Sequence, residues 1–403
     1  MVLTKSYPQF LQKRLDHYEQ VVMPALSSDK SPFFLNVTPN EHSIFVDNND
    51  YLSLSNNAEI IEAQINQLRI NDNSLMSSFF VSGKGQREQF EEQLASHTNQ
   101  EASILSTSGW DANTGLIQTI ADKDTHIYLD RFVHASLYVG AQLSGGMVHV
   151  FDHNNPDHLE RKIKEYGIGV VVVDSVYSSI GSVCPLKEIV EISKKYDCVV
   201  VVDESHSLGL YGNKGAGMVA DLGLEDEVDF ITASLSKTFC SRGGIITCSS
   251  KFKNYFRHNS FPAIFSSVLQ NHEAARFIKT LEIIRNDDWR REQLHQNTAY
   301  LHHHLDHMGF NTEVSSSPII SLEVNNESKA ILLRDLLVQK NVVTAPFIPP
   351  AVPKKRCNAR MTVNCNLTFP QMQHIVKSCK EVLPIVKLSK EDVNQYREDN
   401  LSA

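Results

Sequence analysis

The stretch VVVVDESHSLG, residues 199–209, decides the fold. Its four valines in a row predict a strand buried on both faces, which is typical of a parallel sheet covered by helices. A second run, GVVVVD at 169–174, precedes it, and the helical pattern LKEIVEISKKYD lies between the two. Between residues 88 and 250, further helical patterns alternate with the shorter apolar runs ASIL, HIYL, MVHVF and DFITAS. The sequence therefore predicts an α/β domain with a mostly parallel sheet.

Both valine runs end at an aspartate, Asp174 in the first run and Asp203 in the second. Parallel sheets bind ligands at the carboxyl ends of their strands. A partly desolvated carboxylate at such a position suits a cationic group of a ligand, for example a protonated heteroaromatic nitrogen. Two plainer interpretations stay open. Asp203 could cap a following helix, and His206 could have a structural role.

The rest of the chain predicts a smaller second domain. A helical stretch over 267–308 leads to strands near 318–324 and 359–366, and an amphipathic helix follows. We therefore expect an N-terminal arm at 1–50 that joins the small domain, a large domain at 51–295 and a small α+β domain at 296–403.

Composition and charge argue against several functions. The net charge is −9 without a long basic run, so no nucleic-acid partner is expected, and the basic triplet 354–356 is interpreted as a solvated loop. Because no apolar stretch reaches roughly 18 residues and no secretory signal is seen, neither a membrane span nor export is expected. The seven cysteines are scattered singly, as in the reducing cytoplasm. The histidines at 302–304 fit a helix face, and no metal site is expected.

A single lysine stands out in DFITASLSKTFCSRGG, residues 229–244. Lys237 follows a predicted strand and is flanked by hydroxyl side chains, which suits an amine with a lowered pKa beside an anion. Such an amine can form a Schiff base. The alternative is an ordinary surface lysine.

Two further segments follow predicted strands and open predicted helices. Ser108, Gly109 and Trp110 precede a helix start, where backbone N–H groups bind phosphate. His134 also lies between a strand end and a helix start, and its imidazole either stacks on a flat ring or simply packs. Neither signal decides alone. Together with an aspartate and a lysine they form the binding set for pyridoxal 5'-phosphate (PLP), which is held at its opposite ends.

The motifs SGWDAN, HAS, DSVYSSIG, DESHSLG and TASLSKTF resemble those of the α-oxoamine synthases. These are PLP-dependent enzymes of fold type I that join an amino acid to an acyl-CoA. The resemblance runs from about residue 45 to 385. Within the family, HNNPDHL and FPAIFSS are most similar to the α-hydroxyketone autoinducer synthases of quorum-sensing bacteria. The chain has ASLSK where many relatives have GTLGK, and Asp174 where others carry glutamate.

The resemblance implies a role for each matching residue. Lys237 would carry PLP covalently and move the α-proton, while Asp203 would pair with the ring nitrogen. His206 would bind the ring oxygen, and His134 would stack on the ring. The resemblance further implies that the phosphate is bound by Ser108, Gly109, Trp110 and Ser234, and that Ser178 lies near the ring oxygen. It also implies that Ser266 and Ser267 contact the phosphate in a neighbouring subunit. The substrate would be bound by Asn49, Tyr51 and Arg360, the arginine through the substrate's carboxylate.

The enzyme implied by the resemblance is a cytoplasmic homodimer with shared active sites. It would condense an amino acid or S-adenosylmethionine with a medium- or long-chain acyl-CoA to an α-aminoketone, the precursor of an α-hydroxyketone autoinducer. A metabolic relative is the alternative: 8-amino-7-oxononanoate synthase, glycine C-acetyltransferase or serine palmitoyltransferase. A third hypothesis is a PLP-fold protein without catalysis, but the joint presence of Lys237, Asp203 and His206 argues against it.

Overall fold

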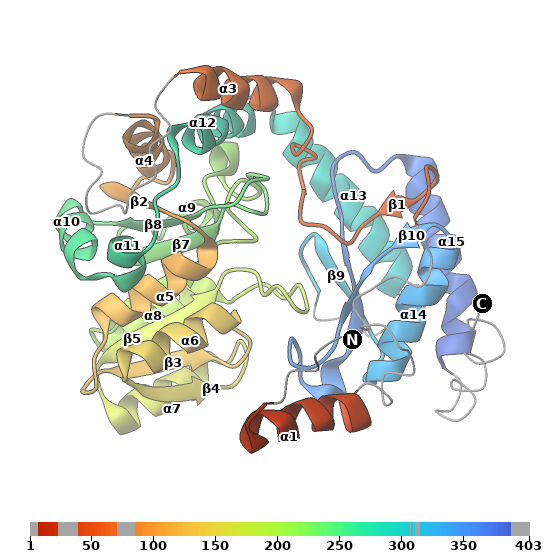
Figure 1. The fold of residues 1–403 in the computed structure, drawn as a ribbon, viewed down its shortest axis with the longest axis horizontal. Helices are drawn as coiled ribbons and strands as arrows, with labels where there is room; N and C mark the ends of the chain where they lie inside the picture. The colour runs from red at the N-terminus through yellow and green to blue at the C-terminus, as the bar shows by residue number, and fades with distance from the viewer. Residues whose placement is uncertain are drawn as a thin grey trace.

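The computed structural model describes residues 7–22, 39–70, 85–306, 308, 310 and 315–387. In Figure 1 the large sheet with its helices forms one half of the molecule, and two small sheets with the C-terminal helices form the other half. The predicted N-terminal arm at 1–50 lies partly outside the described residues.

A seven-stranded sheet is the centre of the larger half. In chain order its strands are β2 (Ala102–Ser106), β3 (His126–Asp130), β4 (Met147–Phe151), β5 (Gly169–Asp174), β6 (Val199–Asp203), β7 (Phe230–Ser234) and β8 (Gly244–Cys248). Their order in the sheet is β2-β8-β7-β6-β5-β3-β4. The strands from β4 to β7 are parallel, whereas β8 pairs antiparallel with both β7 and β2.

The two valine runs form strands of this sheet, as predicted, and the structure places them side by side at its centre. Every residue of β5 is buried, and Asp174 pairs in register with Asp203 at the carboxyl ends of β5 and β6. The other four predicted runs also form strands of this sheet. β8 was not predicted, because its segment follows β7 after the loop 235–243 rather than after a helix.

Helices connect and cover these strands. α5 packs against α6, and α7 packs against α8, while α12 lies against α3 and α4. The helices of this half are α3 (Ala58–Arg69), α4 (Gln86–His97), α5 (Gly109–Ile120), α6 (Ala135–Ser144), α7 (Pro156–Tyr166), α8 (Leu186–Lys195), α9 (Met218–Asp221), α10 (Ser250–Asn259), α11 (Phe261–Phe265) and α12 (Asn271–Asn286), with the 3-10 helix η2 (Asn213–Gly215).

The smaller half contains two short sheets. β1 (Ile44–Phe45) pairs parallel with β10 (Val342–Val343), so this N-terminal strand joins the C-terminal half. The other sheet is antiparallel, in the order β11 (Ala345–Phe347), β12 (Asn358–Thr362) and β9 (Ile319–Glu323). Its helices are α13 (Asp288–Asp306), α14 (Glu327–Gln339), α15 (Phe369–Val386) and the 3-10 helix η3 (Lys354–Arg356); α1 (Gln9–His17) and the π-helix η1 (Tyr18–Val22) precede them in the chain.

The predicted helix over 267–308 is two helices. α12 ends at Asn286, and Asp287 leaves the helical conformation with ψ of 63° before α13 begins. The predicted boundary at residue 295 therefore falls inside α13. The domain limits stay a prediction.

Candidate active site

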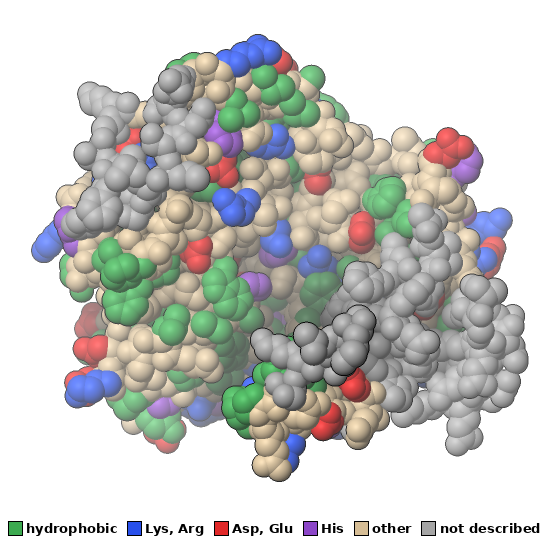
Figure 2. Space-filling view, in the orientation of Figure 1, with side chains coloured by type: hydrophobic (Ala, Val, Ile, Leu, Met, Phe, Trp, Pro, Cys, Tyr) green, Lys and Arg blue, Asp and Glu red, His purple; other side chains and the backbone are tan. Residues whose placement is uncertain are grey.

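A cavity of about 830 Å³ lies where β5, β6 and β7 end, between the two halves of the molecule. Figure 2 shows the molecule hollowed between these halves, with basic side chains inside the hollow. Asp203 and Lys237 line the cavity from the large half, and Phe347 and Arg360 line it from the small half. Residues that are far apart in the sequence therefore meet here.

Two donors hold Asp203 at the end of β6. The side-chain amide of Asn113 donates to Oδ2 over 2.7 Å, and the backbone N–H of Ser205 donates to Oδ1 over 2.8 Å. No helix follows Asp203 over residues 204–212, so the interpretation of Asp203 as a helix cap is wrong. Because both donors are neutral, the carboxylate is fixed in place and its charge remains available to a cationic group in the cavity.

His206 lies on the turn that follows Asp203. Its Nδ1 is 2.7 Å from the hydroxyl of Tyr51. Burial lowers the pKa of His206 well below its usual value, and the cations Lys237 and Arg360 act in the same direction, so the imidazole is neutral. Tyr51 is only 1% exposed. The structure thus places Tyr51 behind His206, where it orients the ring, and not on the cavity wall where a substrate-binding residue was expected.

Lys237 lies in the loop that follows β7, and its side chain lines the cavity. In the described part of the chain, no hydrogen bond or ion pair engages its Nζ. Burial first, and then the cation Arg360, lower the pKa of Lys237 to about 8, while Asp203 opposes the shift. A half-buried amine without a partner does not fit the alternative of an ordinary surface lysine.

The start of α5 and the end of β7 form a cradle of donors. Ser108 caps α5, since its Oγ accepts from the N–H of Asp111 over 3.0 Å. A Cβ on Gly109 would lie 2.5 Å from the Cβ of Ser234, so only glycine allows this approach. The hydroxyls of Ser234 and Ser236 are 2.8 Å apart. Helix N–H groups beside hydroxyls form a site for a phosphate.

His134 and Trp110 line the cavity next to this cradle. His134 is the N-cap residue of α6, and its Nδ1 lies 2.7 Å from the hydroxyl of Ser136. Its ring meets Trp110 edge-on, with the centroids 6.2 Å apart. Burial is the main cause that lowers the pKa of His134. The contacts hold a neutral imidazole in the wall, where a planar ligand can stack on it.

Arg360 reaches the cavity from β12. Its Nη1 donates to the carbonyl oxygen of Ser178 over 2.9 Å, and its Nη2 donates to Oδ1 of Asn49 over 3.1 Å. The guanidinium lies 4.3 Å from the ring centroid of Phe347. Its Nε is buried without a partner among the described residues. Of the five guanidinium N–H groups, the bonds to Ser178 and Asn49 use one on Nη1 and one on Nη2, so each of these nitrogens keeps an N–H for an anionic group such as a carboxylate.

A family model described as aminotransferase class I and II matches residues 42–378. The chain belongs to this family. The CAI-1 autoinducer synthase of Vibrio campbellii is 40% identical over 379 residues, which cover 94% of this chain and 96% of that protein. The 8-amino-7-oxononanoate synthase of Lysinibacillus sphaericus is 32% identical over 359 residues, covering 86% of this chain and 92% of that protein.

The fold of this aminotransferase-family chain is also that of a solved structure. A structure of SPT (serine palmitoyltransferase) with PLP has a TM-score of 0.87 and 25% identity, and the match covers 93% of this chain and 99% of that one. The predicted class, an α/β protein of fold type I, is confirmed, and so is the resemblance to the α-oxoamine synthases.

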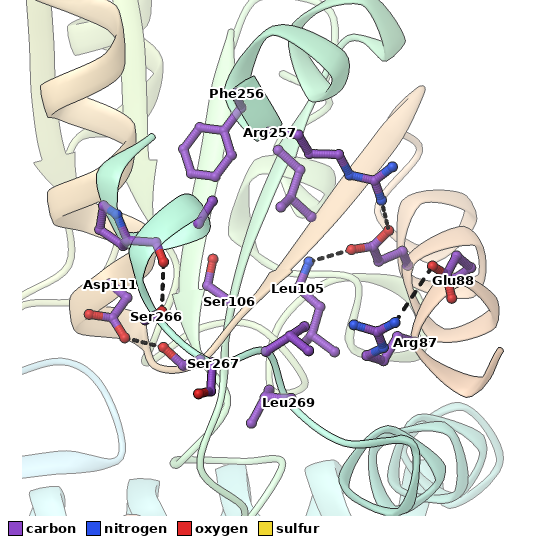
Figure 3. Close-up of a pocket in the computed structure, with 16 residues that line it drawn as sticks. Arg87, Glu88, Leu105, Ser106, Asp111, Phe256, Arg257, Ser266, Ser267 and Leu269 are labelled. Carbon is purple, nitrogen blue, oxygen red and sulfur yellow. Dashed lines mark hydrogen bonds and ion pairs between the residues drawn. The ribbon is translucent and has the colours of Figure 1, made fainter. Parts of the chain in front are cut away.

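Two predicted site residues of this family member lie outside the main cavity. Ser266 and Ser267 line a second, smaller cavity together with Asp111 and Arg87 (Figure 3). The hydroxyl of Ser266 donates to the carbonyl oxygen of Pro262 over 2.6 Å. Neither serine lines the cavity of Lys237 in the same chain. Their contact with a neighbouring subunit's phosphate stays a prediction.

The residues that fix Asp203 were not predicted from the sequence. Asn113 follows Gly109 by four residues on α5, so the helical repeat within SGWDAN could have indicated that it lies on the side of the cradle. Ser205 stands inside DESHSLG, where a donor two residues after an aspartate is a usual turn. Phe347 has no such local signal, because it reaches Arg360 from another strand of the small sheet.

The described residues contain no group of three or more His, Cys, Asp and Glu side chains that could hold a metal ion. Within the same ranges, the helices are all too short or too polar to cross a bilayer.

Proposed function

We propose that the chain is a PLP-dependent acyltransferase. It condenses an amino acid or S-adenosylmethionine with a medium- or long-chain acyl-CoA to an α-aminoketone, the precursor of an α-hydroxyketone autoinducer. The observation that carries this proposal is the unpartnered amine of Lys237 in one cavity with the fixed carboxylate of Asp203. The 40% identity with a CAI-1 autoinducer synthase supports the substrate class.

The cavity residues fit PLP in charge and shape. Asp203 would hold the ring nitrogen in its cationic form, and the cradle at Gly109 and Ser234, which admits no added Cβ, would hold the phosphate. Lys237 would bind the aldehyde carbon through its free amine. When bound, PLP supplies an electron sink for negative charge at the α-carbon of an amino substrate.

The chain's own residues would then orient the substrate and move one proton. Arg360 would bind the carboxylate of the amino substrate, because it lines the cavity and its Nη1 and Nη2 each keep an N–H that the bonds to Ser178 and Asn49 do not use. A lysine with a pKa of about 8 is a base matched to neutral pH, so Nζ of Lys237 would accept the α-proton. The neutral rings of His134 and His206 would contact the PLP ring without adding charge.

We further propose a cytoplasmic homodimer with shared sites. Ser266 and Ser267 open to a cavity other than that of their own Lys237, which supports a contribution to a second copy's site. All seven cysteines are free, as is usual in a reducing compartment.

Product mass spectrometry tests the proposed substrates. The purified enzyme is offered glycine, alanine, serine, 2-aminobutyrate and S-adenosylmethionine, with acyl-CoAs of graded length. We expect α-aminoketones from S-adenosylmethionine or 2-aminobutyrate with medium or long acyl chains. A preference for glycine with a short acyl-CoA would instead support a metabolic α-oxoamine synthase.

Two variants test the proposed chemistry. Lys237→Ala should lose both turnover and the covalent cofactor that borohydride fixes in the wild type. Asp203→Asn should keep its fold but lose roughly a hundredfold or more in kcat, because a neutral partner holds a cationic ring less well. Normal turnover by either variant would contradict the proposal; circular dichroism serves as the control for folding.

A further inference from the structure

Outside the active-site cavity, Asp130, His153 and Ser182 form an Asp–His–Ser arrangement. Nδ1 of His153 lies 2.9 Å from Oδ1 of Asp130, and Nε2 lies 2.8 Å from Oγ of Ser182. Because a carboxylate only accepts, Nδ1 donates to Asp130, and Nε2 shares a hydrogen bond with the serine hydroxyl. Hydrolases use the same order of groups to activate a serine.

This serine is not placed to react with a substrate. Ser182 is only 5% exposed, and it does not line the active-site cavity. The arrangement must therefore be understood from its other contacts.

The carboxylate of Asp130 joins three segments of chain. Asp130 ends β3 and is fully buried. Besides His153 it accepts the backbone N–H of Phe132 and that of Asn154, each over 2.8 Å. The side-chain amide of Asn154 in turn donates to the carbonyl oxygen of Val183 over 2.9 Å. The segments that leave β3, β4 and β5 at their carboxyl ends are thus tied together.

One of these segments is a wall of the active-site cavity. Arg131, Phe132 and His134 all line it. The ring of Phe132 packs on that of His153 with the centroids 4.7 Å apart, and Nη2 of Arg131 pairs with Asp152 at 2.5 Å. His153 therefore supports this wall twice, through the hydrogen bond to Asp130 and through its own ring.

We propose that His153 is a positioning residue for the acyl-CoA, acting through the wall made by Arg131 and Phe132. The proposal rests on the proposed function. An aromatic ring beside a guanidinium suits a ligand that combines an acyl chain with phosphates. The amino substrate is assigned to Arg360 on another element, β12. Loss of His153 should therefore weaken acyl-CoA binding and leave binding of the amino substrate unchanged.

Two substitutions separate the hydrogen bonds of His153. The shorter amide of His153→Asn can still donate to Asp130, whereas the longer amide of His153→Gln replaces the contact at Nε2 and loses that donor. We expect His153→Gln to raise the KM for acyl-CoA about five- to tenfold, the worth of one hydrogen bond, and His153→Asn to raise it less. The KM for the amino substrate and the cofactor absorbance should not change.

His295→Gln is the matched control. Like His153, His295 is a histidine held by a hydrogen bond and an aromatic contact: its Nε2 bonds the backbone carbonyl of Leu210 at 3.1 Å, and its ring contacts that of Tyr211. It does not line the active-site cavity. Kinetic constants equal to those of the wild type are expected.

Hydrogen exchange of the purified holoenzyme gives a readout that needs no substrate. His153→Gln should speed exchange in peptides covering 130–134 and 152–155, with no change in 199–203. Unchanged exchange would overturn the positioning role, and so would an equal rise in KM for both substrates. If the wild type turns over no acyl-CoA, the proposed function and the ligand assigned to this wall fail, while faster exchange would still support the positioning of the wall.

Discussion

At the scale of single residues, the chemistry depends on how Lys237 is charged. Burial and Arg360 lower the pKa of this lysine to about 8, against 10.5 for a free side chain. At pH 7.4 roughly a fifth of such amines are neutral, compared with about 0.1% of exposed lysines. Arg360 thus has two effects, because it offers a donor to an anion and also keeps the lysine reactive.

Replacing Arg360 should therefore change the pH dependence of cofactor binding. A nearby cation disfavours the charged amine, so Arg360→Gln should raise the pKa of Lys237, and the neutral amine will need a higher pH. We expect the midpoint of the rate of PLP binding to cofactor-free protein to move up from about 8 by roughly half a unit or more. The rate is followed by absorbance.

Arg131→Gln is the control for this measurement. Arg131 lines the same cavity but is not among the charges that shift the pKa of Lys237. A midpoint that stays in place or moves down in Arg360→Gln would show that the arginine does not act on the lysine.

The sequence revealed some of these residues and hid others for physical reasons. Asp203 and Lys237 follow apolar strands, so their positions at strand ends could be predicted. The shift in the pKa of Lys237 could not, because its causes are the depth of the cavity and an arginine from β12. Tyr51 was placed on the substrate side, whereas the structure buries it against His206.

At the scale of elements, the site depends on a close contact between the backbone of β8 and the backbone at the start of α5. A Cβ on Gly244, the first residue of β8, would lie 2.6 Å from the N–H nitrogen of Gly109 and closer still to the carbonyl oxygen of Ser108. β8 therefore sets the position of the N-terminus of α5 and of the cradle that we propose holds the phosphate. This strand was not predicted from the sequence, although it lies next to the predicted site.

Gly244→Ala should damage both stability and cofactor binding. The added methyl group must push α5 or β8 aside, since the atoms that it meets are backbone. We expect a loss of about 1–3 kcal/mol in the free energy of unfolding, measured with urea, and weaker binding in a PLP titration.

Gly85→Ala is the control, because its added Cβ would meet only the flexible side chain of Asn271, at 3.0 Å. If Gly244→Ala matched the wild type in both measurements, the backbone contact would be too loose to position the cradle.

At the scale of the whole molecule, the α/β class and a smaller C-terminal α+β half were predictable from alternating strand and helix patterns. The pairing of β1 with β10 was not, because nothing local marks two-residue strands that meet from opposite ends of the chain. The proposed homodimer depends on surface residues that no local pattern marks, and the structure offers a place to test it. Phe265 on α11 is 80% exposed and directly precedes Ser266 and Ser267.

Phe265→Glu should therefore weaken self-association. A charge buried in an apolar interface is costly, so we expect the dimer dissociation constant to rise at least about tenfold in analytical ultracentrifugation, with turnover falling at concentrations where the dimer dissociates. Leu143→Glu is the control, because Leu143 is 63% exposed on α6. A wild-type dissociation constant for Phe265→Glu would place the interface elsewhere.

The guanidinium of Arg360 bonds the carbonyl of Ser178 and the side chain of Asn49, and so bridges the two halves of the molecule at the wall of the cavity. Any rotation of one half against the other would move Arg360 away from Lys237, and would change substrate binding and the pKa of the lysine together. A substrate anion bound to Arg360 would hold the arginine in place and so stabilise the contact between the two halves. The rate of turnover would then depend on how long the two halves stay closed around the bound substrate.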